Sequence, residues 1–239
     1  MVRIPHIIHQ TWKNDNLPEA FRPMSRTWRE MLPNWEYRLW TDEMCCEFVH
    51  CHYPDFLPQY DAYPMNIQRA DAIRYFLLQT YGGLYVDLDF ECLKPDFVSI
   101  IEEAEFVAGK EPYVHARRYN MEYLICNALM ASVPNHPFME YVIRRMKNHP
   151  KGWNFQHVED ILSSTGPILL TEAYRDFPQK ESLKIVEPQY LYPIWLGEVN
   201  LIKRGNMQEG MAHRINAAYA LHHFSGTWWQ ELSSASRQA

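Results

Sequence analysis

The chain has 239 residues, 47% of them hydrophobic and 14% aromatic, so it can bury a sizeable core, and we expect residues 1–239 to form one domain. Its formal net charge is −6 at pH 7. A protein that binds nucleic acid without sequence specificity needs a basic surface to displace phosphate counterions, so the charge argues against a nucleic-acid partner. The five cysteines contain no CxxC pair, which favours reduced thiols in a cytoplasmic setting.

The hydropathy of the chain predicts no membrane span. A helix that spans a membrane needs about 18 consecutive apolar residues, and no stretch of the chain approaches that length. The N-terminus lacks the apolar run of a signal peptide. We therefore expect a cytoplasmic protein, and association with a membrane surface is compatible with that expectation.

The first part of the chain alternates strand and helix patterns. Residues 4–12, IPHIIHQTW, form a short apolar stretch that predicts a buried first strand. Residues 18–32 have helical spacing, and residues 35–41, WEYRLWT, alternate as a second strand should. Thr41 and Asp42 then offer N-caps for a helix.

The middle of the chain joins a helix to a strand through two glycines. The apolar residues of 65–81 repeat every three to four positions, which predicts a helix, and Gly82 and Gly83 provide its C-terminal stop. Residues 84–91, LYVDLDFE, predict the strand that follows. Such alternation builds an α/β fold with a largely parallel sheet.

Further elements are expected downstream. Strands are predicted at 105–111 and 123–132, helices at 136–149 and 165–177, and strand-like segments around LKIVEP and near residues 219–224. No internal repeat and no Gly- or Ser-rich linker interrupts this pattern, which supports the single domain.

Carboxylates gather at the end of the predicted strand 84–91. Successive side chains of a strand point to opposite faces, so Tyr85, Asp87, Asp89 and Glu91 should share one face. Two aspartates that point the same way repel each other unless a cation lies between them, and Mg²⁺ or Mn²⁺ prefers such oxygen ligands. A DxD triplet alone is weak evidence, but ligands of open α/β sheets gather at this end of the strands.

The helix before this strand carries further polar groups. Asp71, Arg74 and Tyr75 lie three and four positions apart and therefore share one helical face. One interpretation is a solvated ion pair of little energetic value. The other is that Asp71 accepts hydrogen bonds from hydroxyl groups of a ligand while the guanidinium of Arg74 braces a carboxylate or that ligand.

Five blocks of the sequence resemble glycosyltransferase family 32. They are IPHIIHQTW, RADAIRYFLLQTYGGLYVDLDF, NALMASVPNHPF, TGP and HHFSGTW, and they run from residue 4 to about residue 229. The resemblance implies a GT-A fold, a Rossmann-like nucleotide-binding domain with a mostly parallel central sheet flanked by helices. It also implies a DxD motif that binds Mn²⁺ or Mg²⁺, a nucleotide-diphosphate sugar as donor, and retention of anomeric configuration.

The resemblance assigns roles to residues at matching positions. Asp71 and Arg74 would bind the donor sugar, Asp87 would contact ribose, sugar or metal, and Asp89 would ligate the metal, and we expect these four residues to form the catalytic site. Trp12 would stack on the nucleobase, a contact that any base allows, although a core tryptophan is the alternative.

The C-terminal block would complete the metal and diphosphate site. His223 is the candidate metal or diphosphate contact, with His222 close behind it, because a neutral imidazole binds Mn²⁺ and a protonated one can face phosphate. Neighbours on a strand face opposite ways, so the sequence leaves open which of the two histidines makes the contact. Ser225 and Trp228 would belong to a segment that closes over the donor. Asn127 would hydrogen-bond the sugar, or it is a satisfied buried amide.

Together with the residues, the resemblance implies a retaining glycosyltransferase that moves a hexose from a UDP- or GDP-sugar to a saccharide or glycolipid acceptor. The main alternative is a non-catalytic nucleotide-sugar or carbohydrate-binding protein of the same fold. A phosphohydrolase built on the paired aspartates is a third possibility. The acceptor would meet variable loops such as 112–122 and 150–165.

Overall fold

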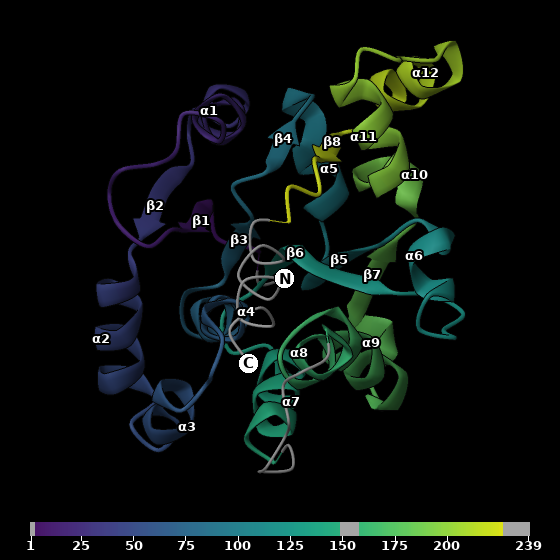
Figure 1. The fold of residues 1–239 in the computed structure, drawn as a ribbon. Coiled ribbons are helices and arrows are strands. Elements are labelled where there is room, and N and C mark those ends of the chain that lie inside the picture. Colours follow the sequence, from purple (N-terminus) through teal and green to yellow (C-terminus); the bar gives the residue numbers. More distant parts are fainter. Residues whose placement is uncertain (1–2, 149–157, 227–239) are drawn as a thin grey trace, which may run out of the picture.

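A computed structural model describes residues 3–148 and 158–226, which form a six-stranded sheet between two layers of helices and a separate two-stranded ribbon (Figure 1). In spatial order, the strands of the sheet are β2 (Glu36–Trp40), β1 (Ile7–Thr11), β3 (Gly83–Val86), β6 (Ile125–Ser132), β5 (Phe106–Lys110) and β7 (Leu183–Val186). The ribbon pairs β4 (Phe90–Cys92) with β8 (Ala220–His222) in antiparallel register.

The sheet is mostly parallel. Strand β1 runs parallel to β2 and β3, and β5 runs parallel to β7, whereas β6 runs antiparallel to both β3 and β5. The carboxyl ends of β1, β3 and β5 therefore meet at one edge, where β6 begins. The predicted α/β class with a mostly parallel central sheet is confirmed.

Helices cover both faces of the sheet, and in Figure 1 they form one group above it and one below it. The bounds of the helices are α1 (Arg22–Met31), α2 (Asp42–His52), α3 (Leu57–Asp61), α4 (Asn66–Tyr81), α5 (Val98–Ile101), α6 (Tyr113–Arg117), α7 (Pro137–Lys147), α8 (Val158–Ser164), α9 (Pro167–Asp176), α10 (Pro188–Leu191), α11 (Leu196–Lys203) and α12 (Glu209–Ala217). Among these residues, no helix is long and apolar enough to cross a membrane.

Strand alternation places the residues of β3 in two of the three hydrophobic clusters that the described residues form. Leu84 and Val86 of β3 pack in the cluster that contains Trp28 of α1, while Tyr85 packs in the opposite cluster with α4, α7 and α9. The period of two along β3 is the one expected for a strand buried on both faces.

Helix α4 ends where the sequence predicts. Gly82 has a φ of +64°, and a Cβ at this position would lie 2.7 Å from the carbonyl oxygen of Ser132. Gly83 has a φ of +95°, and its Cβ would lie 2.6 Å from the carbonyl oxygen of Ile7. Only glycine allows both the left-handed backbone and this close approach, so the pair turns the chain from α4 into β3.

The prediction of one continuous strand over residues 84–91 is wrong. Strand β3 ends at Val86, and the next residues turn, with the N–H of Phe90 donating to the carbonyl of Asp87 at 3.1 Å. The chain then enters β4 in the other sheet. Asp87 and Asp89 therefore converge because of a turn at the end of a strand, and the alternation of strand faces does not explain their placement.

Candidate functional site

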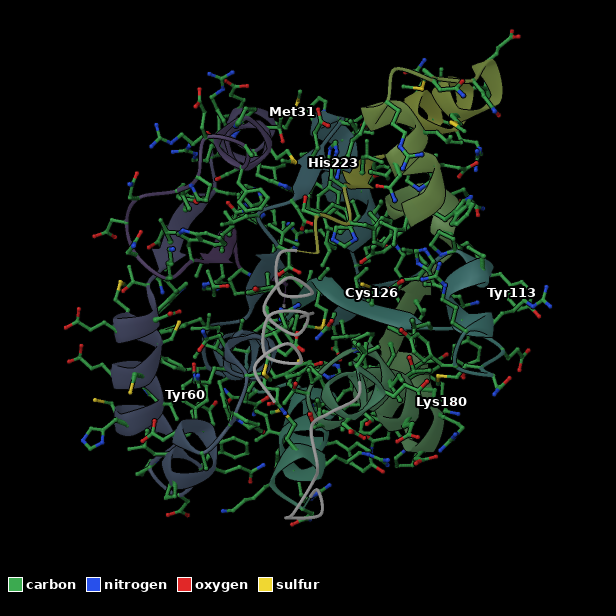
Figure 2. All side chains as sticks on the ribbon, viewed as in Figure 1. Met31, Tyr60, Tyr113, Cys126, Lys180 and His223 are labelled. Carbon is green, nitrogen blue, oxygen red and sulfur yellow. The ribbon has the colours of Figure 1, made fainter. Side chains whose placement is uncertain are left out.

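A pocket of about 780 Å³ opens at the edge where the carboxyl ends of β1, β3 and β5 meet. Its lining includes residues that directly follow these strands, together with one side of α4 and the segment after β8. In Figure 2, the lining residue Cys126 lies at the centre of the molecule on β6, and His223 lies near the ribbon. The pocket thus has the position that ligands occupy in open α/β sheets.

Asp87 forms one side of this site. Its backbone N–H donates to the carbonyl of Ala128 at 2.8 Å, which fixes the residue directly after β3. The Tyr85 hydroxyl donates to its carboxylate at 2.9 Å, and a guanidinium nitrogen of Arg74 lies 3.4 Å away. Burial raises the pKa of Asp87, and the positive charge of Arg74 opposes that rise. The side chain remains 28% exposed and faces the pocket.

Asp71 and Arg74 form a buried ion pair on α4. Their side chains are 6% and 3% exposed and approach to 2.9 Å, which excludes the interpretation as a solvated surface pair. Arg74 also donates to the carbonyl of Asn127 at 2.8 Å. The side-chain amide of Asn127 and the hydroxyl of Thr165 both donate to Asp71. Burial raises the pKa of Asp71 to about 6, against the opposing effects of Arg74 and these two donors.

Asp89 is held from the C-terminal side of the chain. The backbone N–H of Ser225 donates to its carboxylate at 2.7 Å, and Nε2 of His222 lies 3.2 Å from the other oxygen. Burial alone would raise the pKa of Asp89, but the contacts with His222 and Ser225 outweigh burial and hold the pKa well below its usual value. Asp89 is therefore an anion at neutral pH, as a metal ligand must be.

Three side chains of the site fit a divalent metal. Asp87, Asp89 and His222 each offer one ligand atom, and these atoms all lie within 4.8 Å of one another. Two carboxylate oxygens and one imidazole nitrogen form a donor set that Mn²⁺ accepts well, and the carboxylates also suit Mg²⁺.

Of the two adjacent histidines, His222 is the one whose imidazole lies against Asp89. The imidazole of His223 turns to Glu91, with Nε2 at 3.0 Å from its carboxylate. Neighbouring side chains at the end of β8 point to opposite sides, so only one of the two histidines can face Asp89. His222 also stacks on Phe90, with ring centroids 4.8 Å apart, which fixes its plane.

The other predicted site residues differ in their burial and in their contacts. Trp12 is half-buried, lines the pocket and packs edge-on against Phe21, with ring centroids 5.5 Å apart. Asn127 is a buried amide satisfied by Asp71, and it also lines the pocket. Ser225 acts through its backbone N–H. Trp228 lies outside the described residues.

Sequence reasoning left Tyr85 and Thr165 without a role at this site. Tyr85 stands two residues before Asp87, so its place on the predicted strand could have suggested a contact. Thr165 reaches Asp71 from the loop before α9, a contact between residues 94 positions apart that no local pattern reveals.

Comparisons with known proteins give one family model and several curated relatives. Residues 18–107 match the family described as the glycosyltransferase sugar-binding region containing a DXD motif, and they include α4 and the Asp87-Leu88-Asp89 turn. The chain is 37% identical over 177 residues to inositol phosphoceramide mannosyltransferase 2 of Schizosaccharomyces pombe, covering 74% of this chain and 48% of the relative. It is 34% identical over 192 residues to a mannosyl phosphorylinositol ceramide synthase of Saccharomyces cerevisiae, covering 78% of this chain and 47% of the relative.

One solved structure supports the fold at greater evolutionary distance. The PaToxG glycosyltransferase superposes with a TM-score of 0.51 at 17% identity, covering 91% of this chain and 89% of that one. This likeness concerns the fold alone, which is the GT-A fold that the sequence resemblance implied. The chain spans about half the length of the curated relatives that it matches.

Proposed function

Because the chain belongs to the glycosyltransferase family with a DXD sugar-binding region, we propose that it transfers a hexose from a nucleotide-diphosphate sugar to an acceptor hydroxyl. The observation that carries the proposal is the convergence of Asp71, Arg74, Asp87 and Asp89 in one pocket of about 780 Å³. A pocket of this size is within the range that ligand-binding pockets of proteins occupy.

The donor sugar is assigned to the α4 side of the pocket. Asp71 accepts from Arg74, Asn127 and Thr165, and a carboxylate has about four lone-pair positions, so about one position is left for a sugar hydroxyl. Arg74 holds Asp71 and Asp87 at the same time, which keeps the two carboxylates in a fixed relation. Trp12 offers an aromatic face for the nucleobase.

A divalent ion, Mn²⁺ or Mg²⁺, would be held by Asp87, Asp89 and His222. Such an ion supplies positive charge that stabilises the departing nucleoside diphosphate. The residues around it keep these ligands in place, since Tyr85 and Arg74 hold Asp87 while Ser225 holds Asp89.

The reaction that we propose retains the anomeric configuration. The bond between the anomeric carbon and the donor phosphate breaks, and a bond from that carbon to the acceptor oxygen forms on the same face. The acceptor proton passes to the departing diphosphate. Asp71 orients the sugar through its hydroxyls, and the preorganised charges of the pocket lower the barrier without rearranging.

For the acceptor, we propose a glycolipid head group or a saccharide with a hydroxyl-rich ring. The two fungal relatives are named for inositol phosphoceramide and phosphorylinositol ceramide. Helix α6 borders the pocket and exposes Tyr113, which is 62% exposed and projects away from the body of the molecule (Figure 2). Val114 of the same helix is 38% exposed, and Arg117 and Arg118 follow in the sequence. This combination of exposed apolar and basic residues fits contact with an anionic membrane surface.

The test is a panel of nucleotide-sugars, including GDP-mannose, UDP-glucose and UDP-galactose, measured for Mn²⁺-dependent hydrolysis and transfer. Asp89→Ala should abolish both reactions. Asp55→Ala is the matched control, because the Asp55 side chain is 90% exposed and lies outside the pocket. Full activity in Asp89→Ala would refute the site.

Two other outcomes would favour the alternatives. Tight binding of a nucleotide-sugar without turnover would favour a non-catalytic binding protein. Hydrolysis of simple phosphate esters without any nucleotide-sugar would favour a phosphohydrolase.

Proton NMR of the first-formed product would report the anomeric configuration, and an inverted product would contradict retention.

A further inference from the structure

A further carboxylate, that of Glu111, lies at the same edge of the sheet as the DxD turn. Glu111 directly follows β5, and its backbone N–H donates to the carbonyl of Leu124 at 2.8 Å. Its side chain is 11% exposed and lines the same pocket as Asp87. Strand β6 separates β3 from β5, so the strands that carry the two carboxylates are about 10 Å apart, which leaves room for a sugar ring between them.

His115 fixes this carboxylate as a hydrogen-bond acceptor. The backbone N–H of Leu196 donates to Nε2 of His115 at 3.2 Å, so in the neutral ring the proton lies on Nδ1. Nδ1 is 2.6 Å from the Glu111 carboxylate and donates to it. The ring of Phe224 packs edge-on against His115, with centroids 4.9 Å apart and an interplanar angle of 90°.

The charge of Glu111 is only partly compensated by the protein. Among the described residues, His115 is its salt-bridge partner, and neither lysine nor arginine takes that role. Burial raises the pKa of Glu111, but the hydrogen bond from His115 acts in the opposite direction, and the pKa lies below its usual value. A carboxylate that stays ionised in a pocket has unused acceptor positions, and a ligand with hydroxyl groups can fill them.

We propose that Glu111 binds the acceptor, accepting hydrogen bonds from hydroxyls of a sugar or cyclitol ring on the β5 side of the pocket. His115 is a positioning residue that holds the Glu111 carboxylate toward that ring. This inference rests on the proposed glycosyl transfer, and it adds the place and chemistry of acceptor recognition.

The experiment compares Glu111→Gln with the wild type in two kinetic measurements. The first is the donor KM for Mn²⁺-dependent hydrolysis, which needs no acceptor. The second is the acceptor KM for transfer to myo-inositol or to methyl α-mannoside, two probes that distinguish a cyclitol from a sugar. Glu111→Gln should raise the acceptor KM about 10-fold or more, because a charged hydrogen bond is lost, and should change the donor KM much less.

Two further variants define the roles. His115→Phe removes the donor to Glu111 and should raise the acceptor KM by a smaller factor than Glu111→Gln does. Glu187→Gln is the matched control, because Glu187 is 53% exposed and pairs with Lys110 outside the pocket. Its acceptor KM should equal that of the wild type.

The outcomes separate this inference from the proposed function. An unchanged acceptor KM in Glu111→Gln, or an equal rise in both KM values, would overturn the acceptor role. If the wild type turned over none of the donors, the proposed function would fail, and ligand-detected NMR of the two probes would then decide the inference. Probe binding that weakens in Glu111→Gln supports it, and binding that is equal or undetectable in both proteins overturns it.

Discussion

The backbone N–H of Ser225 donates a hydrogen bond of 2.7 Å to the Asp89 carboxylate, joining residues 136 positions apart in the chain. Ser225 follows β8, and Asp89 directly precedes β4, so the bond extends the pairing of these two strands to the wall of the pocket. The candidate metal site is thus built from the turn after β3 on one side and from the segment after α12 on the other.

The two adjacent histidines of this segment should differ in their effect on metal binding. His222→Ala removes an imidazole that faces Asp89 and should weaken Mn²⁺ binding about 10-fold or more. His223→Ala removes an imidazole that contacts Glu91 and should have a much smaller effect. Electron paramagnetic resonance of Mn²⁺ titrated into each variant measures both affinities, and equal losses would contradict the choice of His222.

Removal of Arg74 should be far more destabilising than removal of a surface arginine. Arg74→Met leaves Asp71 and Asp87 without their shared cation, which we expect to cost about 3 to 5 kcal/mol in the free energy of unfolding. Arg145→Met breaks exposed pairs with Glu172 and Asp176 and should cost less than about 1 kcal/mol. Urea unfolding of both variants gives the comparison, and similar losses would show that the buried network contributes little.

Alanine should destabilise the fold more at Gly82 than at Gly205, a glycine with a similar backbone conformation. Gly82 and Gly205 have φ values of +64° and +79°, so alanine is strained at either position. A Cβ at Gly82 would meet the Ser132 carbonyl at 2.7 Å, whereas a Cβ at Gly205 meets nothing within 4 Å. Gly82→Ala should therefore lower the free energy of unfolding by at least about 1 kcal/mol more than Gly205→Ala. Equal losses in thermal and urea unfolding would rule out the steric contribution.

His9 should make the fold sensitive to acid. The indole N–H of Trp40 donates to Nδ1 of His9 at 3.1 Å, and Nε2 lies 3.0 Å from the carbonyl of Gly82, an arrangement that requires a neutral ring. Burial lowers the pKa of His9 from 6.5 to about 4. In the unfolded chain the ring takes a proton below pH 6.5, so this stability is present above pH 6.5 and is lost as the pH falls to 4.

The expected loss over this pH window is about 3 kcal/mol in the free energy of unfolding. His9→Gln keeps an amide that can donate to Gly82 and does not titrate. Its unfolding free energy, measured by urea at several pH values, should fall less steeply between pH 6.5 and 4, with a slope smaller by about 1.4 kcal/mol per pH unit. If the unfolding free energies of the wild type and the variant fell in parallel between pH 6.5 and 4, the His9 ring would be protonated in the folded state over this range.

Local sequence patterns predicted the elements that carry Asp71, Arg74 and Asp87. The long periodic run of α4, its glycine stop and the apolar stretch of β3 each carry a strong local signal, so their order and type agree with the structure. The grouping of Asp71 with Arg74 followed from helical spacing, and the structure adds that both are buried. Short helices such as α10 contain too few residues for periodicity to identify them.

The features that the sequence did not predict depend on contacts between distant residues. The turn at Asp87 exists because Phe90 pairs with His222 of β8, and that pairing also decides which histidine faces the pocket. Glu111 reaches the site because β5 lies beside β6 in the sheet. Strand order and strand phase of this kind follow from tertiary packing, so they leave no trace in a local pattern.

The pairing of β4 with β8 also makes metal binding a reporter of folding. Because Asp89 and His222 are brought together only when residues 90 and 222 pair, the unfolded chain cannot present the ligand set. An ion that binds only the folded chain stabilises it by mass action, by about 2.7 kcal/mol at a concentration 100 times its Kd. The melting temperature should therefore rise with Mn²⁺ concentration. When the ion is scarce, the free energy of unfolding would be lower and more of the chain would be unfolded.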